Sequence, residues 1–468
     1  MLEYLGLALL VFQVIVFLYF ILVNSIYTLF NFISLVALFR QSYVVSSQGL
    51  TNILSNNFYK PLSIIAPAYN EEETIVASLK SLLSLYYPEY EVIVVNDGSK
   101  DKTLEKLISE FKLIVANKPV DLINEHKPIK NIYLSYDYPN LIVVDKENGG
   151  KADALNAGIN VSNYPIFCCI DADSLLENEA LLRAARLFVE QREVIATGGI
   201  IRVMNGCKIE NGVVTELKTP KGLIEALQAV EYTRGFLSGR TGWNAFGSLL
   251  IISGAFGLFR KDIVQAVKGY RHTVGEDMDL VVRMHKYCID NDIKYKVVFV
   301  PDPICFTQAP SDLKSLLLQR NRWQRGLIDT LLFNKKMIAN PKYGAVGLLG
   351  FTYFTFVEAL GPIIEILGYV GFAIFYILGY LDKEIAILFL TISILWGMWI
   401  NISSIILDNI LFRRYHSLKD ILLLCFYSLV EMFGYRQIIT FERLIGTFQF
   451  WKKGWGKPKR QTIKALEN

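Results

Sequence analysis

Charge of either sign is scarce in this sequence. Only 20% of its 468 residues are Asp, Glu, Lys or Arg, and 48 basic against 44 acidic residues leave a formal net charge of +4. Soluble domains usually carry about 25% charged residues. The near balance excludes a strongly basic nucleic-acid binder and an acidic disordered chain. We therefore expect no nucleic-acid partner.

Cysteine pairs are also missing. The chain has six cysteines, none of them in a CxxC pair, and their spacing fits no zinc site. Cys168 and Cys169 lie in an apolar run, which predicts small core residues. Unpaired cysteines of this kind fit a reducing, cytosolic compartment for the soluble part of the chain.

The sequence is instead rich in apolar residues. They make up 52% of the chain and gather at its two ends. Residues 5–39 contain no charged side chain and form a run too long for the core of a signal peptide. This run predicts one tilted membrane helix or a span with an interfacial stretch, with two tight spans as the alternative. Glu3 before it and Arg40 after it place the N-terminus outside.

Three further apolar blocks, 344–381, 385–411 and 418–435, lie in the C-terminal third. The first is long enough for two short crossings, and Gly361-Pro362 is expected to break it. The basic tail reads as cytosolic, so the number of crossings after the soluble domain should be even. We expect three to four spans here, although four would place Arg413 and Arg414 outside.

Glu358, Glu365 and Glu431 lie inside or at the edges of these apolar blocks. Carboxylates in a bilayer are costly and tend to face a protein interior or a water path. One interpretation is that they are interfacial or form hydrogen bonds between helices. The alternative is that they line a polar channel.

The middle of the chain alternates short apolar runs with helical patterns. The runs at 62–66, 91–95, 140–144 and 166–170 predict buried strands, and the stretches 71–85, 103–111 and the one beginning at 152 predict helices. Asn70 is expected to cap the first helix. This order predicts a mostly parallel α/β sheet, in which ligands bind at the carboxyl ends of the strands. Residues 112–139 are polar and predict an irregular surface insertion.

Acidic and glycine-rich clusters follow these strands. Asp171 and Asp173 form a DxD pair after one strand, which suits a divalent cation that keeps phosphate oxygens as further ligands. Asp97 ends another strand, where it can accept hydrogen bonds from a base or ribose. Gly149-Gly150-Lys151 allows close backbone approach to an anion and supplies a positive charge. Taken alone, the glycine pair also fits an ordinary turn.

Two later motifs complete the set. Asp277, in Gly275-Glu276-Asp277, can act as a general base on an attacking hydroxyl, although acids at a helix start also serve as caps. In Gln319-x-x-Arg322-Trp323 the arginine can bind phosphate and the indole can stack on a sugar. An interfacial membrane anchor is the other interpretation of this motif.

Taken in order, these residues resemble the membrane-integrated inverting glycosyltransferases of family 2. That group includes the synthases of cellulose, chitin, hyaluronan and poly-N-acetylglucosamine. The matching stretches are Ala66-Pro-Ala-Tyr-Asn-Glu-Glu, Val95-Asn-Asp-Gly-Ser-Lys-Asp, Asn148-Gly-Gly-Lys-Ala-Asp-Ala-Leu-Asn, Asp171-Ala-Asp, Ser253-Gly-Ala-Phe-Gly, Gly275-Glu-Asp and Gln319-x-x-Arg-Trp. They cover roughly residues 60–335.

The resemblance implies a GT-A type, mostly parallel α/β domain inserted between transmembrane helices. The implied parts are an N-terminal transmembrane segment (1–40), a linker or interfacial stretch (41–60), a cytosolic GT-A domain (61–335), C-terminal transmembrane and interfacial helices (336–450) and a basic cytosolic tail (451–468). The protein would be a multi-pass component of the plasma or inner membrane. Its partners would be a UDP-sugar, a growing polysaccharide, the lipid bilayer and accessory secretion subunits.

The resemblance also implies roles for single residues. Asp277 would be the catalytic base, and Asp173 and Asp171 would hold Mg²⁺ or Mn²⁺. The implied contacts with donor and acceptor belong to Ala66, Tyr69, Glu71 and Asp97 at the uridine, Lys151 at the diphosphate, Ser253, Gly254 and Ala255 near the acceptor, and Gln319, Arg322, Trp323 and the secondary candidate Arg325 at the diphosphate and acceptor sugar. Glu276 is a further substrate-binding candidate. Trp455, in Gly454-Trp-Gly-Lys, resembles part of a gating loop, with an interfacial anchor as the alternative.

The expected activity is that of a processive, metal-dependent, inverting hexosyltransferase. It would extend a β-linked chain from a UDP-sugar and pass the chain across the membrane. A glucan of cellulose or mixed-linkage type is the favoured product. The alternatives are an N-acetylglucosamine or hyaluronan-like polymer and a non-processive transfer to a lipid.

Overall fold

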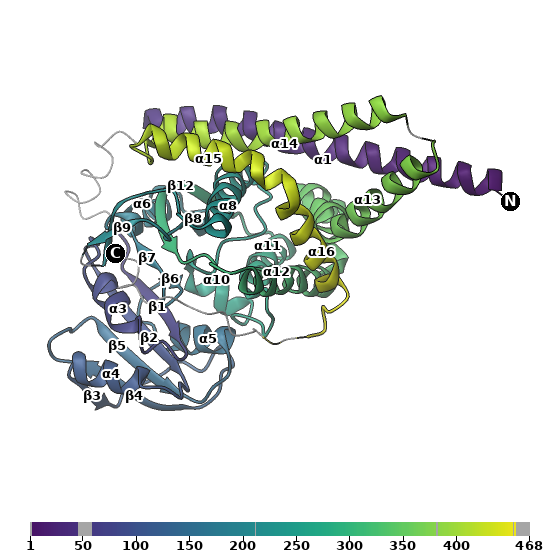
Figure 1. Ribbon diagram of the computed structural model, residues 1–468. Helices are drawn as coiled ribbons and strands as arrows, with labels where there is room; N and C mark the ends of the chain where they lie inside the picture. Colours follow the sequence, from purple (N-terminus) through teal and green to yellow (C-terminus); the bar gives the residue numbers. More distant parts are fainter. Residues whose placement is uncertain (1, 45–58, 211, 381, 453, 455–468) are drawn as a thin grey trace.

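The computed structural model describes residues 2–44, 59–210, 212–380, 382–452 and 454. A mixed α/β domain forms one body of the molecule, and long helices lie across one side of it and extend beyond it (Figure 1). The N-terminal and C-terminal parts of the chain lie together in this helical layer, so the α/β domain is inserted between them.

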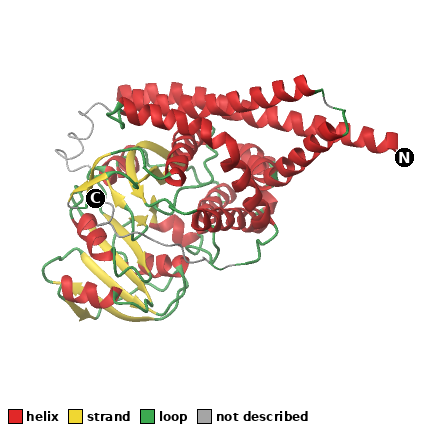
Figure 2. Ribbon diagram, viewed as in Figure 1, coloured by secondary structure: helices red, strands yellow, loops and turns green. Residues whose placement is uncertain are grey.

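A ten-stranded sheet runs through the α/β domain in the order β3-β4-β5-β2-β1-β6-β11-β8-β12-β7. Figure 2 shows its strands in yellow with helices on both sides. In chain order they are β1 (Leu62–Ala68), β2 (Tyr90–Asp97), β3 (Leu113–Ala116), β4 (Ile129–Ser135), β5 (Leu141–Lys146), β6 (Ile166–Ile170), β7 (Leu175–Leu176), β8 (Val194–Val203), β11 (Phe256–Arg260) and β12 (Lys296–Thr307). A separate hairpin pairs β9 (Lys208–Glu210) with β10 (Val213–Glu216).

The strands β5, β2, β1 and β6 lie side by side and pair in parallel. Only β4, β11 and β7 run against the common direction. Each of these four parallel strands is a run of buried apolar residues, because helices cover both faces. The four strands predicted from the sequence are therefore confirmed, and so is the largely parallel sheet. Cys168 and Cys169 are buried in β6, as expected.

The predicted helices of this domain are present, but their ends differ from those of the sequence patterns. The helices of the domain are α3 (Ile75–Leu83), α4 (Thr103–Glu110), α5 (Lys151–Val161), α6 (Ala180–Ala185), α7 (Leu187–Glu190), α8 (Leu223–Tyr232), η1 (Thr233–Arg240), α9 (Thr241–Ala245), α10 (Lys261–Ala266), α11 (Glu276–Asp290), α12 (Leu313–Phe333) and the short turns η2 (Lys335–Met337) and η3 (Pro341–Tyr343). Asn70 does not cap a helix that begins at residue 71. It adopts a left-handed conformation, φ 57°, and its side chain accepts a hydrogen bond from Lys100 N instead.

The prediction of an irregular insertion at 112–139 is wrong in part. β3 and β4 form an antiparallel extension of the sheet beside β5. The sequence pattern did not reveal these strands because they are the two outermost strands on one side of the sheet. Several of their side chains are exposed there, and strict apolar alternation is not required.

The apolar ends form long helices. They are α1 (Leu2–Val44), η4 (Val346–Phe351), η5 (Phe354–Ala359), α13 (Gly361–Ile377), α14 (Lys383–Phe412), α15 (Leu418–Val430), η6 (Glu431–Tyr435) and α16 (Arg436–Thr447). Within the described residues, three segments are long and apolar enough to cross a membrane, Leu10–Phe39, Lys383–Phe412 and Leu418–Thr447. The bent pair Val346–Ala359 and Gly361–Ile377 raises the number to four if the pair is one span.

The sequence correctly located the break in the first C-terminal block. The helix axis bends by 41° where Gly361-Pro362 begins α13. A bend of this size does not reverse the chain, so the block forms one bent path where the sequence suggested two short crossings. The N-terminal block forms a single helix, α1, as predicted.

The carboxylates of the apolar blocks all have partners on other helices. Glu431 pairs with Arg234 at 3.0 Å and accepts a hydrogen bond from Asn401 of α14. Glu358 pairs with Arg443 at 3.0 Å. Glu365 accepts a hydrogen bond from Thr440 Oγ1 at 3.0 Å. These contacts match the interpretation that the carboxylates hold helices together.

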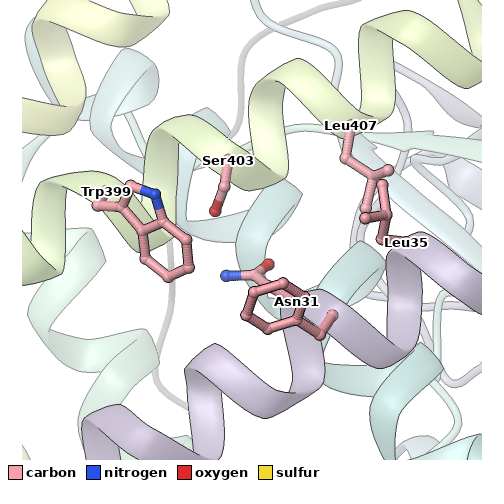
Figure 3. Close-up of a pocket in the computed structure, with 6 residues that line it drawn as sticks. Asn31, Leu35, Trp399, Ser403 and Leu407 are labelled. Carbon is pink, nitrogen blue, oxygen red and sulfur yellow. The ribbon is translucent and has the colours of Figure 1, made fainter.

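A small groove of about 100 Å³ lies between α1 and α14 (Figure 3). Phe32, Leu35, Trp399 and Leu407 give it an apolar lining, with Asn31 and Ser403 as its polar members. It is distant in sequence from every motif described above. The residues that line the groove are mostly apolar, as is the surface of the helices around it.

Candidate active site

Three neighbouring strands bring the candidate residues to one edge of the sheet. β2, β1 and β6 are adjacent and parallel, so their carboxyl ends meet there. Asp97 is the last residue of β2, and Asp171 directly follows β6. This edge is the place where parallel α/β sheets bind ligands.

The loops after β1 and β2 are joined by hydrogen bonds. Asn70 N donates to Ser99 Oγ at 3.0 Å, and Glu71 N donates to Thr103 Oγ1 at 2.9 Å. Of the three residues predicted to line a uridine pocket here, Ala66 and Glu71 are buried, whereas Tyr69 is 42% exposed. The ring of Tyr69 is therefore available to a ligand from solvent.

Asp97 organises the glycine loop of the neighbouring strand. Its carboxylate accepts hydrogen bonds from Gly149 N at 2.9 Å, Gly150 N at 2.7 Å and the buried Lys146 Nζ at 2.8 Å. Burial raises the pKa of Asp97, and the bond from Lys146 opposes that rise. Both carboxylate oxygens are engaged, so the geometry assigns Asp97 to loop support. Its contact with uridine stays a prediction.

Gly150 has φ 89°, which favours glycine, and the helix α5 begins at the next residue, Lys151. The Lys151 ammonium lies 2.5 Å from Asp171 Oδ1 and 3.5 Å from Glu276 Oε1. Burial disfavours its charge, but these two carboxylates outweigh that effect and raise the pKa of Lys151. The lysine therefore stays positively charged at the centre of the site.

Two buried acids next to this lysine are held partly protonated near neutral pH. Burial raises the pKa of Glu276 to about 7, against the opposing charge of Lys151. Burial also raises the pKa of Asp173, and the nearby Asp171 carboxylate raises it further. Arg322 opposes both shifts, so its guanidinium lies near these acids although it comes from α12. A cation at this place would relieve the same repulsion.

The acidic pair fits part of a metal site. Within the described segments, no three His, Cys, Asp or Glu side chains gather as a metal-ligand cluster. Mg²⁺ and Mn²⁺ are commonly bound by one or two carboxylates together with phosphate and water oxygens. Asp171 and Asp173 match that incomplete ligand set.

Asp277 also lies near Lys151. Its Oδ2 accepts a hydrogen bond from Gly254 N at 3.2 Å, and its Oδ1 accepts one from Met278 N at 2.8 Å. A Cβ atom on Gly254 would lie 3.1 Å from Lys151 Nζ and 3.8 Å from Asp277 Oδ2. The loop of Ser253 and Gly254 therefore borders both the cation and the candidate base.

Two glycines bring the base to the helix that carries the Gln-x-x-Arg-Trp motif. A Cβ atom on Gly326 of α12 would lie 2.7 Å from Gly275 Cα, and one on Gly275 would lie 2.8 Å from Gly326 Cα. No side chain fits between these backbones. This close approach fixes Glu276 and Asp277 beside α12, and the sequence indicated such a packing role for neither glycine.

Trp323 lies on α12 with 43% of its surface exposed. The Arg320 guanidinium is 4.2 Å from the centre of its ring and pairs with Glu231 at 2.6 Å. Tyr435 Oη donates to the same Glu231 carboxylate at 2.9 Å. The ion pair between Arg320 and Glu231 therefore holds the guanidinium against the indole of Trp323. The exposed surface of the indole remains accessible to a ligand.

Two further candidates on α12 differ in their surroundings. Gln319 Oε1 is buried and has no hydrogen-bond partner among the residues that the structure describes. Arg325 instead donates to the backbone oxygens of Lys452 and, at 3.1 Å, of Gly454. It ties the C-terminal segment to α12. The predicted gating residue Trp455 lies outside the described residues.

The mixed sheet with this acidic edge is a GT-A-like α/β fold. The chain matches the model of glycosyl transferase family 2 over residues 63–267 and that of glycosyl transferase family group 2 over residues 166–400. Because the second match covers half of the chain, the protein belongs to the family 2 glycosyltransferases. The family predicted from the motifs is confirmed.

Similar curated proteins include poly-beta-1,6-N-acetyl-D-glucosamine synthases of Staphylococcus. One from Staphylococcus epidermidis is 31% identical over 271 residues, 58% of this chain and 55% of its own length. One from Staphylococcus aureus strain COL is 28% identical over 274 residues, again 58% of this chain and 55% of its own length. The match thus spans about half the length of these relatives.

A solved structure supports the fold. A mannosyltransferase from Pyrobaculum calidifontis, determined with GDP-Man and Mn²⁺, superposes with a TM-score of 0.50 at 15% identity. The superposition covers 87% of this chain and 99% of that structure. At this identity it is evidence for the arrangement of elements alone.

Sequence reasoning missed the residues that act through distant contacts. Arg320 lies inside the recognised motif, yet its pairing with Glu231 depends on a segment 89 positions away. Lys146 ends β5 and is fully buried against Asp97, which no periodicity suggests. A lone lysine at the end of an apolar strand was the available signal.

Proposed function

We propose that the protein is a processive, inverting glycosyltransferase that extends a β-linked poly-N-acetylglucosamine chain from UDP-GlcNAc. The main supporting observation is the convergence of Lys151, Asp277 and Gly254 beside the acidic strand edge and beside α12, the helix that carries Arg322 and Trp323. A cation suited to a diphosphate, a candidate base and the helix with the exposed indole thus lie together.

In the proposed reaction, Asp277 accepts the proton of an acceptor hydroxyl, whose oxygen attacks C1 of the donor sugar. The bond between C1 and the diphosphate oxygen breaks as the new glycosidic bond forms, and UDP leaves with both bonding electrons. Attack from the face opposite UDP converts an α-linked donor into a β-linked product. Lys151 and Arg322 stabilise the charge that develops on the diphosphate.

Asp173 and Asp171 would hold Mg²⁺ or Mn²⁺, with Asp173 as the direct ligand. The cation would supply further positive charge for the leaving diphosphate. The raised pKa of Asp173 supports this assignment, because a buried carboxyl beside another carboxylate is stabilised in its charged form by a cation.

The choice of sugar follows the relatives. The curated proteins described above are named as N-acetylglucosamine polymer synthases and not as glucan synthases. They favour the N-acetylglucosamine alternative over the glucan that the motifs alone suggested. Their names also favour a β-1,6 linkage.

Contacts of the C-terminal segment support a cytosolic catalytic domain. Arg414, in the turn between α14 and α15, bonds to Asp302 O of β12 at 2.9 Å. Asp420 at the start of α15 accepts a hydrogen bond from Thr219 N at 2.9 Å. Near the end of α16, Thr447 Oγ1 accepts one from Gln324 at 3.0 Å. The beginning of α15 and the end of α16 therefore both lie beside the catalytic domain.

We accordingly propose that α1, the bent pair and α14 cross the membrane and that Leu418–Thr447 lies at its cytosolic face. This arrangement keeps Arg413, Arg414 and the basic tail inside. In intact cells, a membrane-impermeant thiol reagent should label Glu384→Cys, at the start of α14, and leave Lys419→Cys unlabelled. Both parent side chains are exposed. Labelling of Lys419→Cys from outside would contradict the topology.

The function is tested with purified protein in lipid nanodiscs. Labelled UDP-GlcNAc and UDP-glucose are supplied separately with Mg²⁺ or Mn²⁺, and the products are sized and digested with linkage-specific hydrolases. A long N-acetylglucosamine polymer made only from UDP-GlcNAc is expected. Transfer of a single sugar to lipid, or polymer from UDP-glucose alone, would refute the proposal.

A further inference from the structure

The helical segment η1 has two different sides. It continues α8 as a π-helix of eight residues, a conformation often found at functional sites. On one side Leu237 and Ser238 are buried, and Ser34 of α1 donates to Ser238 O at 3.1 Å. The other side carries Gly235, which is exposed, and Phe236, Gly239 and Arg240, which are half-buried. We call these four residues the η1 strip.

The glycines of the η1 strip leave open space. A Cβ atom on Gly235 would meet no atom within 4 Å, and one on Gly239 would meet only Arg234 O at 3.8 Å. Glycine inside a helix costs about 1 kcal/mol relative to alanine. No neighbouring atom of the described residues requires glycine at these two positions. The effect of the two glycines is therefore the open space that they leave beside the helix.

A row of aromatic rings joins the η1 strip to the platform on α12. The centres of the Trp323 and Tyr232 rings are 6.5 Å apart, and those of Tyr232 and Phe236 are 5.7 Å apart. The guanidinium of Arg240 lies 4.0 Å from the centre of the Phe236 ring. The strip therefore begins beside the exposed indole and ends at Arg240.

Arg240, at the other end of the η1 strip, lies near the candidate base Asp277. Its Nη1 donates one long hydrogen bond, 3.4 Å, to Ile251 O, two residues before Ser253. Burial lowers the pKa of Arg240 to about 10, and the nearby charge of Asp277 opposes that shift. No ion pair involves Arg240 in the part of the chain that the structure describes. Most of its five N–H donors are left for a ligand.

We infer that the η1 strip is the subsite for the sugars directly behind the acceptor end of the growing chain. The Phe236 ring would support the apolar face of a sugar, and Arg240 would donate to its hydroxyl or acetamido oxygens. The inference rests on the proposed function, because it extends the acceptor path from Trp323 toward Asp277.

The charge of Arg240 also sets a preference. A guanidinium forms hydrogen bonds with neutral acetamido groups, whereas it repels the protonated amine of a deacetylated sugar. We therefore expect the strip to bind N-acetylated oligomers better than their glucosamine counterparts.

Binding is measured first without donor, so that the result does not depend on transfer. The solubilised full-length protein is titrated with N-acetylglucosamine oligomers and followed by tryptophan fluorescence and calorimetry. Arg240→Met should weaken binding about tenfold, the effect of losing a hydrogen bond from a charged group. Arg240→Lys should recover part of it. Arg260→Met, which removes an arginine paired with exposed Asp262, is the matched control.

The second variant tests the open space. Gly239→Leu should fill the strip and shorten the polymer, while the KM for UDP-GlcNAc stays within about twofold of the wild type. Unchanged oligomer binding in both Arg240→Met and Gly239→Leu would overturn the inference, and so would an equal loss of donor and oligomer affinity. Absence of polymer from wild-type protein that still binds oligomers through Arg240 would instead refute the proposed transfer reaction.

Discussion

The edge of the sheet and the surface of α12 hold their site residues by different means. At the ends of β2 and β6, buried and half-buried charges contact one another, as Lys151 does with Asp171 and Glu276. Around α12, the backbone of Gly275 touches that of Gly326, and Arg320 supports the ring of Trp323. In the first region, contacts between charged side chains set the charges of the site residues. In the second region, packing sets the positions of the site residues and the distances between them.

This difference predicts how each region fails. Removing a charge at the sheet edge leaves another charge buried without its partner, which changes protonation and chemistry. Altering a contact around α12 displaces the acceptor relative to the base and leaves the donor region intact. Donor binding and acceptor use should therefore be separable by mutation.

The largest effect is expected where the two regions meet. Asp277→Asn should lower transfer about 10³-fold, because a general base contributes about 10²-fold to 10⁴-fold. UDP affinity should stay close to the wild type. Asp290→Asn, at the other end of α11, provides the same substitution as a control. Steady-state UDP release and calorimetric UDP binding give the two readouts, and near-normal transfer by Asp277→Asn would remove this residue from the mechanism.

A smaller loss should follow from separating the two helices. Gly326→Val forces side-chain atoms between backbones whose separation allows no Cβ atom. A displacement of about 1 Å at the reacting atoms costs about 10²-fold in rate, so transfer should fall by that factor while UDP binding remains. Thr330→Val is the control, one turn further along α12, at a buried hydroxyl that has no partner among the described residues. Parallel loss of UDP binding would show that the regions are not separable.

The support of the indole should matter less. Glu231→Gln removes the negative charge beside Arg320 and loosens the ring of Trp323. We expect about tenfold weaker acceptor use and shorter polymer at an unchanged KM for the donor, since a charged hydrogen bond contributes about 1.5–3 kcal/mol. Glu225→Gln on the same helix α8 is the control. A change in donor KM alone would contradict this role.

The smallest predicted effect concerns protons at the sheet edge. Because the pKa values of Asp173 and Glu276 are raised, to about 7 for the latter, protons would compete with the proposed cation near neutral pH. Lowering the pH from about 8 to about 6 should raise the Mn²⁺ concentration needed for half-maximal UDP binding several-fold. Asp171→Asn should move this dependence to lower pH, because it removes the neighbouring negative charge. A metal requirement independent of pH would contradict the argument.

The sequence predicted the sheet edge better than the surroundings of α12. Asp97, Asp171 and Lys151 could be placed together because each directly follows a recognisable buried strand or begins the next helix. Parallel strands bring such residues to one edge whatever the intervening loops do. The same reasoning did not foresee that Asp97 bonds to the loop of Gly149 and Gly150.

Contacts between distant segments could not be predicted in the same way. The pairing of Arg320 with Glu231 and the approach of Gly275 to Gly326 depend on how helices pack, which local patterns do not encode. The outermost strands β3 and β4 were missed for a related reason, since partial exposure removes their apolar alternation. Asn70 was misjudged because its side chain serves a neighbouring loop and not its own helix.

The position of Arg414 has a consequence for how the protein is made. Its partners Glu177 and Asp302 belong to segments that are synthesised more than 100 residues earlier. During synthesis, the catalytic domain can therefore already present a folded acidic surface when α14 leaves the ribosome. Binding of Arg414 to that surface would hold the end of α14 on the same side of the bilayer as the catalytic domain and would thereby prevent the following apolar segment from being drawn across.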